Sequence, residues 1–481
     1  MKLISLFFYI QIFLLLTAGY ATGQDKVLRK EAIAAMKKAT IYFRNNVSTH
    51  GGYLFRYSED FSLREGEEVA TPTMIWIEPP GTPEVGMRYL EAYEATEDTL
   101  FLNGAIEACR ALAWGQLESG GWDHRIEFDP EASKKWYYRR DIESGDLQKG
   151  RRRNSSSLDD DVSQSSLRLL MRTDKVLSFK NKEIHHAAMY CLESILKVQY
   201  PNGAWPQWFT EPPDPKLFPV KKAQYPAGWS RVFPGESYSD FYTFNDNSMA
   251  DVVTTMIEAY GIYGDEKYIN AAKKCGDFII MAQMPEPQPA WAQQYNINME
   301  PSWARKFEPP SVSGYESFGA MNTLLELYLN TGDKKYLEPI PKALKWAKSS
   351  LLPDGRLARF YELHTNKPLY FDRSYTLMYE DHDMPTHYSF KVPADALYRV
   401  ESLYSRILSS DRKSILADRE KLSGSNPADV VEVINNLDDK GRWIEKGSMR
   451  AGKERIETNV ITCATFNRNM STLTNFVRTN N

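Results

Sequence analysis

A motif of two helices recurs along this chain and limits the folds that are open to it. The two clearest copies join their helices through the same dipeptide, Gly264-Asp265 in one and Gly332-Asp333 in the other. Each copy then ends in a loop rich in glycine and proline that carries a tryptophan or an arginine. A single helical hairpin cannot bury its apolar face alone, so tandem copies have to pack on one another.

Four copies can be recognised: residues 91–122, a weaker one that ends at 198–205, and residues 258–291 and 326–355. No alternating strand and helix signal runs through them. The pattern predicts a mainly α fold, an α/α toroid or barrel of antiparallel hairpins with functional loops at one rim. A straight solenoid is the alternative. The long, proline-rich and aromatic segment 208–242 argues against it, because loops of that length in compact domains are usually functional.

The two ends of the chain differ from the repeat. Lys2, the apolar residues 4–17 and the small residues 21–23 have the layout of a secretory signal. An uncleaved membrane anchor is the alternative, but the apolar run is shorter than the ~20 residues that span a bilayer. We predict a signal peptide over 1–23, a catalytic toroid over 24–408 and a small peripheral extension over 409–481. The mature protein is expected to be secreted or periplasmic and free of the membrane.

Composition excludes several classes of function. A net charge of −4 over 481 residues gives no overall case for nucleic-acid binding. The four cysteines are far apart and lack metal-ligand spacing, so they imply no disulfide framework. The sequence also lacks the motifs of zinc proteases, P-loop proteins, serine hydrolases and dinucleotide-binding proteins.

Acidic residues gather at the starts of two predicted helices. Asp159, Asp160 and Asp161 precede one apolar helical pattern, and Asp246 with Asn247 precedes another. In a closed array of hairpins, equivalent helix starts face the same rim, so the two groups are expected to converge. Such a cluster suits Ca²⁺ or a pair of acids that cleaves a glycosidic bond. Independent helix caps are the third interpretation, and Asp161 is expected to be a cap.

Basic residues follow the last two hairpins. Arg305 lies after the third hairpin, and Arg359 and Arg373 lie after the fourth. Guanidinium groups bind carboxylates through two parallel hydrogen bonds. Ordinary surface ion pairing is the alternative for each arginine. Acids and arginines together in one cleft favour a polyanionic ligand that a cation links to the acids.

Five ordered stretches resemble the motifs of a known family, the family 10 pectate lyases. They are Leu158 to Asp160, residues 202–207 (Asn-Gly-Ala-Trp-Pro-Gln), residues 243–249 (Thr-Phe-Asn-Asp-Asn-Ser-Met), residues 303–317 and residues 359–370, with Arg373 beyond. The resemblance covers roughly residues 85 to 390.

The resemblance implies an enzyme that cleaves de-esterified homogalacturonan by Ca²⁺-assisted β-elimination and leaves 4,5-unsaturated oligogalacturonides. It implies that Asp159 and Asp246, with Asp160 and Asn247, hold Ca²⁺, and that Arg305 is the base. Arg359 and Arg373 would bind uronate carboxylates. The other residues expected to contact the polygalacturonate chain are Trp205, Tyr361, Asn366 and Lys367. Asp160 stands where many relatives have Asn, and Lys367 where many have Arg. A monomer is expected.

An arginine base imposes a condition on its surroundings. A free guanidinium keeps its proton up to a pKa above ~12, so cationic neighbours and Ca²⁺ are expected to lower the pKa of Arg305. Two other functions stay open at this stage. One is an α/α-toroid glycoside hydrolase that acts on uronic-acid-containing oligosaccharides through an Asp pair. The other is a non-catalytic polyuronate-binding protein.

Overall fold

The computed structural model describes residues 25–235, 238, 241–421 and 424–480. The predicted signal peptide, residues 1–23, lies outside the described residues. Among the helices in these ranges, none has both the length and the apolar character that crossing a bilayer requires.

The chain divides into two compact units. The first comprises the described parts of Met1–Gly115 and Lys421–Asn481, together with His124–Lys134. The second comprises Gln116–Asp123 and Lys135–Glu420. The C-terminal residues therefore pack with N-terminal ones. The division into a catalytic domain over 24–408 and an extension over 409–481 stays a prediction.

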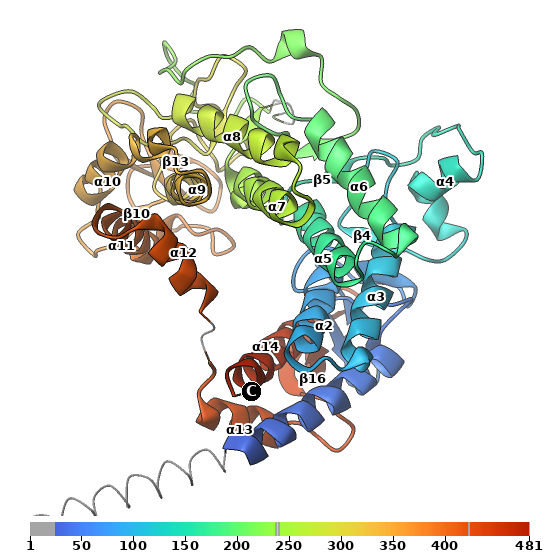
Figure 1. Ribbon diagram of the computed structural model, residues 1–481. Helices are drawn as coiled ribbons and strands as arrows, with labels where there is room; N and C mark the ends of the chain where they lie inside the picture. Colours follow the sequence, from blue (N-terminus) through green and yellow to red (C-terminus); the bar gives the residue numbers. More distant parts are fainter. Residues whose placement is uncertain (1–24, 236–237, 239–240, 422–423, 481) are drawn as a thin grey trace, which may run out of the picture. The chain divides into compact units, whose positions relative to one another are not determined.

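The first unit combines a helical hairpin with a small sheet. α2 (Thr82–Thr96) packs on α3 (Thr99–Trp114) and on α14 (Cys463–Thr479), which also contacts α13 (Pro427–Asn435) (Figure 1). The antiparallel sheet has the order β15 (Glu445–Ala451), β16 (Glu454–Thr462), β1 (Arg56–Ser58), β2 (Arg64–Glu65). The other elements are the helical residues 25–42, η1 (Phe43–Val47), and the paired strands β3 (Met74–Trp76) and β4 (Arg125–Glu127).

The second unit is a row of helical hairpins. Four helices lie next to one another in chain order: α5 (Val162–Val176), α7 (Ser248–Tyr263), α9 (Glu316–Thr331) and α11 (Asp395–Ser409) (Figure 1). α6 (Lys182–Lys197) packs on α5, α8 (Glu266–Met281) on α7, and α10 (Ile340–Ser349) on α11. The unit also contains α12 (Arg412–Glu420), η3 (Pro215–Leu217), η4 (Asn245–Asn247) and η5 (Lys334–Leu337), whereas η2 (Ala132–Lys135) falls almost wholly in the first unit. The mainly helical α/α-toroid class is confirmed.

In each Gly-Asp dipeptide, the glycine ends one helix and the aspartate caps the next. Gly264 ends α7 with a left-handed φ of 73°, and Gly332 ends α9 with a φ of 76°. Only glycine adopts this conformation without a steric cost from Cβ. The next residue caps the helix that follows, since Asp265 accepts from the backbone N–H of Lys267 at 3.0 Å. The dipeptide is therefore a compact helix-to-helix turn.

A glutamine at the end of each outer helix repeats the same pair of hydrogen bonds. Gln116 donates through Nε2 to the carbonyls of Gly120 and Ala187, both at 2.9 Å. Gln199 and Gln283 make the equivalent bonds to their own loops and to the next hairpin. All three glutamines satisfy loop carbonyls, and Gln199 and Gln283 each fix one hairpin to the next.

Short strand pairs join the start of an inner helix to the loop after the next outer helix. β5 (Ser156–Ser157) pairs with β6 (Trp208–Phe209), and β7 (Tyr242–Thr243) pairs with β8 (Gln294–Tyr295). β9 (Val312–Ser313) pairs with β11 (Phe360–Tyr361). The remaining strands are β12 (Pro368–Phe371), β13 (Leu377–Met378), β10 (Leu357–Ala358) and β14 (Lys391–Val392). These strand pairs fix the position of the residues that directly precede α5, α7 and α9.

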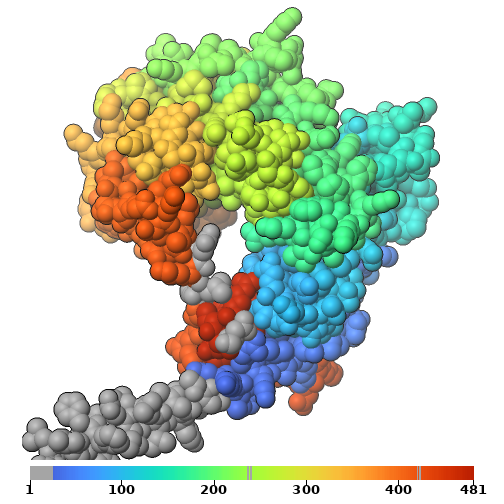
Figure 2. All heavy atoms as spheres, viewed as in Figure 1, coloured from blue at the N-terminus to red at the C-terminus, as the bar shows by residue number. Residues whose placement is uncertain are grey.

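Residues 135–154 form an excursion that carries α4 (Arg139–Glu143) beside α6 (Figures 1 and 2). Arg139 bonds to the ring of His186 on α6 at 2.7 Å. Arg152 pairs with Asp146 at 2.9 Å and with Asp141 at 3.3 Å. Part of the basic charge of the excursion is therefore neutralised within it.

Candidate active site

Two equivalent turns carry the acidic residues into helices α5 and α7. After β5, the N–H of Leu158 donates to the carbonyl of Gln207 at 2.8 Å, and Asp159 to Asp161 follow. After β7, the N–H of Phe244 donates to the carbonyl of Gln293 at 2.8 Å, and Asn245 to Asn247 follow. In both cases four residues separate the strand from the helix. The same backbone turn therefore positions both acidic groups.

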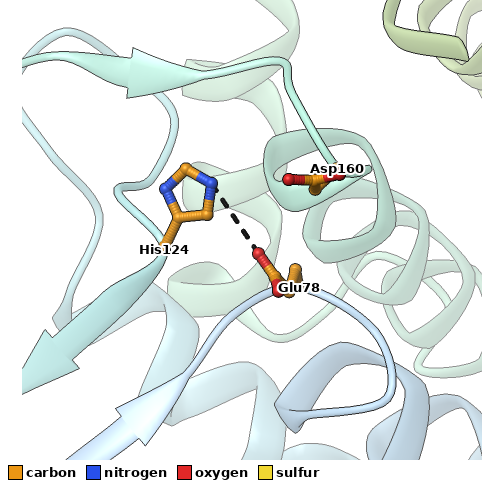
Figure 3. A group of neighbouring side chains, drawn as sticks. All are labelled: Glu78, His124 and Asp160. Atoms are coloured by element: carbon orange, nitrogen blue, oxygen red, sulfur yellow. Dashed lines mark ion pairs between the residues drawn. The ribbon is translucent and has the colours of Figure 1, made fainter. Parts of the chain in front are cut away.

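Both turns pass through the left-handed region of backbone conformation. The φ values are 47° at Asp160 and 59° at Asp161, and 47° at Asp246 and 55° at Asn247. Asp and Asn enter this region more readily than other non-glycine residues, because their short polar side chains bond locally. This explains why acids and amides occupy these positions. Figure 3 labels Asp160 in the turn that leads into α5.

Three of the four predicted metal ligands lie together. One oxygen from each of Asp159, Asp160 and Asp246 lies within 4.8 Å of the other two. Burial, followed by repulsion from Asp159 and Asp160, raises the pKa of Asp246 to about 6. A cation among the three carboxylates would remove that repulsion. This oxygen-only set therefore fits a hard divalent cation such as Ca²⁺.

The fourth predicted ligand, Asn247, lies at the α9 side of its turn. A methyl group on Gly319 of α9 would come within 3.0 Å of the Asn247 carboxamide oxygen. The side chain of Asn247 is exposed. Gly319 thus leaves room for the amide where a larger residue would displace it.

Asp161 is not the helix cap that its position suggested. Its side chain caps no backbone N–H of α5, and its carboxylate pairs instead with Arg168, about two turns along the helix. Arg168 also donates to Thr255 of α7 at 3.0 Å. Burial raises the pKa of Asp161, and burial and the Asp161 carboxylate raise the pKa of Asp251 on α7 to about 7. Arg168 thus joins α5 to α7 beneath the acidic cluster.

Arg305 is held by a carboxylate. Glu308, 3 % exposed, accepts from the backbone N–H of Arg305 at 3.0 Å, from Nε at 2.8 Å and from Nη2 at 2.6 Å. Tyr388 donates to the same carboxylate at 3.0 Å. The Glu308 contact raises the pKa of Arg305. The structure therefore departs from the expectation that the neighbours of Arg305 lower its pKa.

Arg359 lies buried between aromatic rings and a second glutamate. Its Nη2 pairs with Glu316 at 2.6 Å, and its guanidinium carbon lies 4.6 Å from the ring centroids of both Tyr315 and Tyr388. Its buried Nε has no hydrogen-bond partner among the described residues. Arg359 and Arg305 both lower the pKa of Asp246 electrostatically, against the larger effects that raise it. The structure thus brings these two arginines to the acidic cluster.

Two other predicted substrate-binding cations lie on exposed segments. The Arg373 side chain is 70 % exposed and pairs with Asp383 at 3.1 Å. Lys367 is exposed, and its ammonium lies 5.6 Å from the ring centroid of Tyr379. No described contact joins either residue to the three carboxylates. Their assignment as uronate-binding residues stays a prediction.

Trp205 and Tyr361 are interior residues, which corrects the expectation that they contact the sugar chain. The indole N–H of Trp205 donates to the carbonyl of Ile195 at 2.9 Å, as Trp291 does to Ile279 at 2.7 Å. The hydroxyl of Tyr361 accepts from the N–H of Ala358 and donates to the carbonyl of Ser350. Both side chains are 1 % exposed. They satisfy backbone groups of the hairpins and offer no surface to a ligand.

Asn366 has a similar structural role. Its carboxamide oxygen accepts from Trp346 Nε1 and from Gln288 Nε2, both at 2.9 Å. Its amide nitrogen donates to the Ser350 hydroxyl at 2.8 Å. The side chain is therefore engaged at both ends while it stays half-buried, and its assignment as a sugar contact stays a prediction.

Neither Glu316, which holds Arg359, nor a pair in the first unit was predicted from the sequence. His124 Nε2 lies 3.7 Å from Glu78 Oε2 (Figure 3). His124 follows Trp122 by two residues, the offset at which Gln207 follows Trp205 and Gln293 follows Trp291. This offset was the signal in the sequence that singles out His124.

Several solved structures resemble this chain at low sequence identity. The family 10 polysaccharide lyase from Cellvibrio cellulosa is 20 % identical, with a TM-score of 0.44 over 68 % of this chain and 98 % of that one. A mutant of the same lyase in complex with trigalacturonic acid is 19 % identical, with the same TM-score and coverage. The cellobiose 2-epimerase from Spirochaeta thermophila is 14 % identical, with a TM-score of 0.46 over 95 % of this chain and 98 % of that one.

No curated protein matches the sequence. The family model for pectic acid lyase matches residues 116–216 and 217–357. These ranges contain the three carboxylates and Arg305, and they make up half of the chain. The chain therefore belongs to the pectic acid lyase family and is a polysaccharide lyase.

Proposed function

We propose that this protein cleaves de-esterified homogalacturonan, the pectate polymer, by β-elimination with the support of Ca²⁺. The observation that carries the proposal is the placement of three facing carboxylates, Asp159, Asp160 and Asp246, within the electrostatic reach of two arginines. We also propose that the protein acts outside the cytoplasm, on the expectation that residues 1–23 direct its export.

The acidic cluster supports the choice of a hard cation. Asp159, Asp160 and Asp246 are the residues that would hold it, with Asn247 on the same turn as Asp246. When bound, Ca²⁺ supplies positive charge that neutralises a uronate carboxylate and the negative charge that grows beside it. The raised pKa of Asp246 supports this assignment, because Arg359 and Arg305 offset only part of the cost of ionising it.

Arg305 is the group that we propose removes the proton from C5 of the uronate. A base has to be neutral, and the ion pair with Glu308 opposes this by raising the pKa of Arg305. Proton removal therefore requires that the Glu308 contact loosens when substrate binds. Tyr388 shares Glu308 with Arg305 and can satisfy that carboxylate when the guanidinium moves away.

Arg359 is suited to hold negative charge and not to accept a proton. Its pKa is raised by Glu316, and two tyrosine rings fix its plane. A guanidinium held in this way can donate to a uronate carboxylate once a ligand or a side-chain shift uncovers one of its N–H groups. Arg359 therefore stabilises charge that develops on the substrate.

A glycoside hydrolase with an Asp pair is the second candidate, because the pKa of Asp246, about 6, would suit a general acid. The spacing weighs against an inverting hydrolase. The three carboxylate oxygens lie within 4.8 Å of one another, whereas an inverting pair stands roughly 6.5–9.5 Å apart to admit a water molecule.

The test is incubation with polygalacturonate, alginate and glucuronan, followed by two readouts on the same samples. One readout is the ultraviolet absorbance of the 4,5-unsaturated product, and the other is the number of new reducing ends. We expect both to rise together on polygalacturonate. New reducing ends without the chromophore would identify a hydrolase, and binding of the polymer without either would identify a non-catalytic protein.

A further inference from the structure

A segment of the long loop between β6 and β7 is fixed to the loop residues around Arg305. Trp303, two residues before Arg305, donates through Nε1 to the carbonyl of Ser230 at 3.0 Å. The ring of Trp303 also meets Trp229 edge-on at a centroid distance of 6.3 Å and Phe233 at 5.7 Å. Trp303 is 8 % exposed. These contacts seat residues 229–233 next to the segment that carries the proposed base.

Within this segment a cation lies on an aromatic ring. The guanidinium carbon of Arg231 is 3.7 Å from the ring centroid of Trp229. Its Nη2 pairs with Glu362 at 2.6 Å, and the Arg231 side chain remains 49 % exposed. A guanidinium has five N–H donors, and the described polar partners of this one are Glu362 and Tyr379. Arg231 therefore keeps donors that face solvent.

Glu362 is shared by a second cation. Its side chain is 5 % exposed and accepts from Tyr379 at 2.7 Å and from Thr365. Arg231 and Lys367 both lower the pKa of Glu362 electrostatically, although burial acts in the opposite direction. Among the described residues, Lys367 has no ion-pair partner. Two cations thus face one buried carboxylate, and the cluster keeps a positive charge toward solvent.

We propose that Trp229, Arg231 and Lys367 form a second uronate subsite next to the reacting one. The proposal rests on the proposed function, since it names where a neighbouring sugar of the same acidic chain binds. Trp229 offers an apolar surface to the sugar, and the solvent-facing N–H groups of Arg231 bind its carboxylate. Lys367 adds a second charge to the same position.

The opposing interpretation is that Arg231 only fastens the loop to Glu362. A fastening role would change affinity equally for charged and neutral sugar chains. A uronate subsite would change affinity only for chains that carry free carboxylates. A comparison of charged and neutral ligands therefore distinguishes the fastening role from the uronate subsite.

The experiment measures equilibrium affinity by calorimetry on the full chain carrying Arg305→Ala, so that the ligand is expected to stay intact. The ligands are tetragalacturonate and its fully methyl-esterified form. In this background we expect Arg231→Ala to weaken tetragalacturonate binding about tenfold, the loss of one charge-assisted contact. Lys367→Ala should weaken it to a smaller extent. Affinity for the methyl ester should be the same with and without Arg231.

Lys222→Ala is the control, because Lys222 is an exposed cation on the same loop outside the Trp229 cluster. It should change the affinity for tetragalacturonate less than twofold. The proposal is overturned if Arg231→Ala has no effect, if it weakens both ligands alike, or if the parent protein binds no tetragalacturonate.

A failure of the proposed function has a different signature. If the protein with Arg305 intact forms no unsaturated product, yet tetragalacturonate binding still depends on Arg231, the lyase proposal fails and the subsite stands. If product forms but binding does not depend on Arg231, the subsite proposal fails and the lyase proposal stands.

Discussion

The carboxylate of Glu308 holds the guanidinium of Arg305 through two side-chain hydrogen bonds, at 2.8 and 2.6 Å, from a position that solvent barely reaches. A pair of this kind normally serves to keep an arginine charged. In the proposed reaction, the same pair controls the pH at which Arg305 becomes a base.

Glu308→Gln removes the charge and keeps the shape of the side chain. Because the Glu308 contact raises the pKa of Arg305, its loss lowers that pKa, and the neutral guanidine forms at lower pH. We expect the rising limb of kcat/KM against pH to move down by about one unit, the equivalent of ~1.4 kcal/mol. Glu211→Gln, at an exposed position, should leave the profile in place. A limb that moves to higher pH would contradict the role of Glu308.

Asp246→Asn should change stability in opposite directions with and without Ca²⁺. The pKa of Asp246 is raised from 3.8 to about 6, so ionisation costs the folded protein stability as pH rises through that window. At pH 8 in excess chelator, the variant should therefore be more stable than the wild type by about 1–2 kcal/mol, after allowance for solvent screening. When Ca²⁺ is added, its binding should stabilise the wild type more than the variant, so that the wild type becomes the more stable of the two. Thermal unfolding in both buffers measures this, and a variant that is less stable in both would refute the assignment.

Trp205→Phe should affect stability and not catalysis. The substitution leaves the buried carbonyl of Ile195 without its donor, at a cost of about 1–3 kcal/mol in the free energy of unfolding. Trp291→Phe removes the equivalent bond to Ile279 and should cost a similar amount. Denaturant unfolding and KM for polygalacturonate are the measurements. A raised KM at unchanged stability would restore Trp205 as a sugar contact.

Arg168→Met should make stability depend on pH. Arg168 is the described cation beside the half-buried carboxylates Asp161 and Asp251, and its loss leaves them to repel each other. Uncompensated buried charge costs about 3–5 kcal/mol when both acids are ionised. Burial and the Asp161 carboxylate raise the pKa of Asp251 to about 7, so Asp251 binds a proton and loses its charge as pH falls from 8 to 5. The loss measured by denaturant unfolding should be larger at pH 8 than at pH 5. An equal loss at both pH values would mean that packing, and not charge, explains it.

The hairpins and the acidic cluster could be predicted because each depends on local chemistry. The Gly-Asp turns follow from the left-handed conformation of one residue and the capping ability of the next. Asp159, Asp160 and Asp246 could be paired because both groups stand at the same place before an inner helix. The repeat alone was enough to predict that those two turns converge.

The corrections concern residues whose roles depend on partners far away in the chain. Trp205 and Tyr361 lie in motif stretches, and burial alone separates a structural aromatic from a binding one. Their repeated spacing, Trp205 to Phe209, Trp291 to Tyr295 and Leu357 to Tyr361, was visible in the sequence and indicated a structural role. Asp161 was expected to be a cap because it directly precedes a helix. Its pairing with Arg168 could not be predicted, because it depends on the packing of α5 on α7.

Arg305 and the three carboxylates together are proposed to perform a Ca²⁺-dependent elimination. The most direct measurement is the initial rate of 4,5-unsaturated product formation from polygalacturonate by the wild type and by Arg305→Ala, each with Ca²⁺ and with excess chelator. We predict product from the wild type with Ca²⁺ alone, and none from Arg305→Ala even though it still binds the polymer. Near-normal product formation by Arg305→Ala, or by the wild type in chelator, would contradict the account.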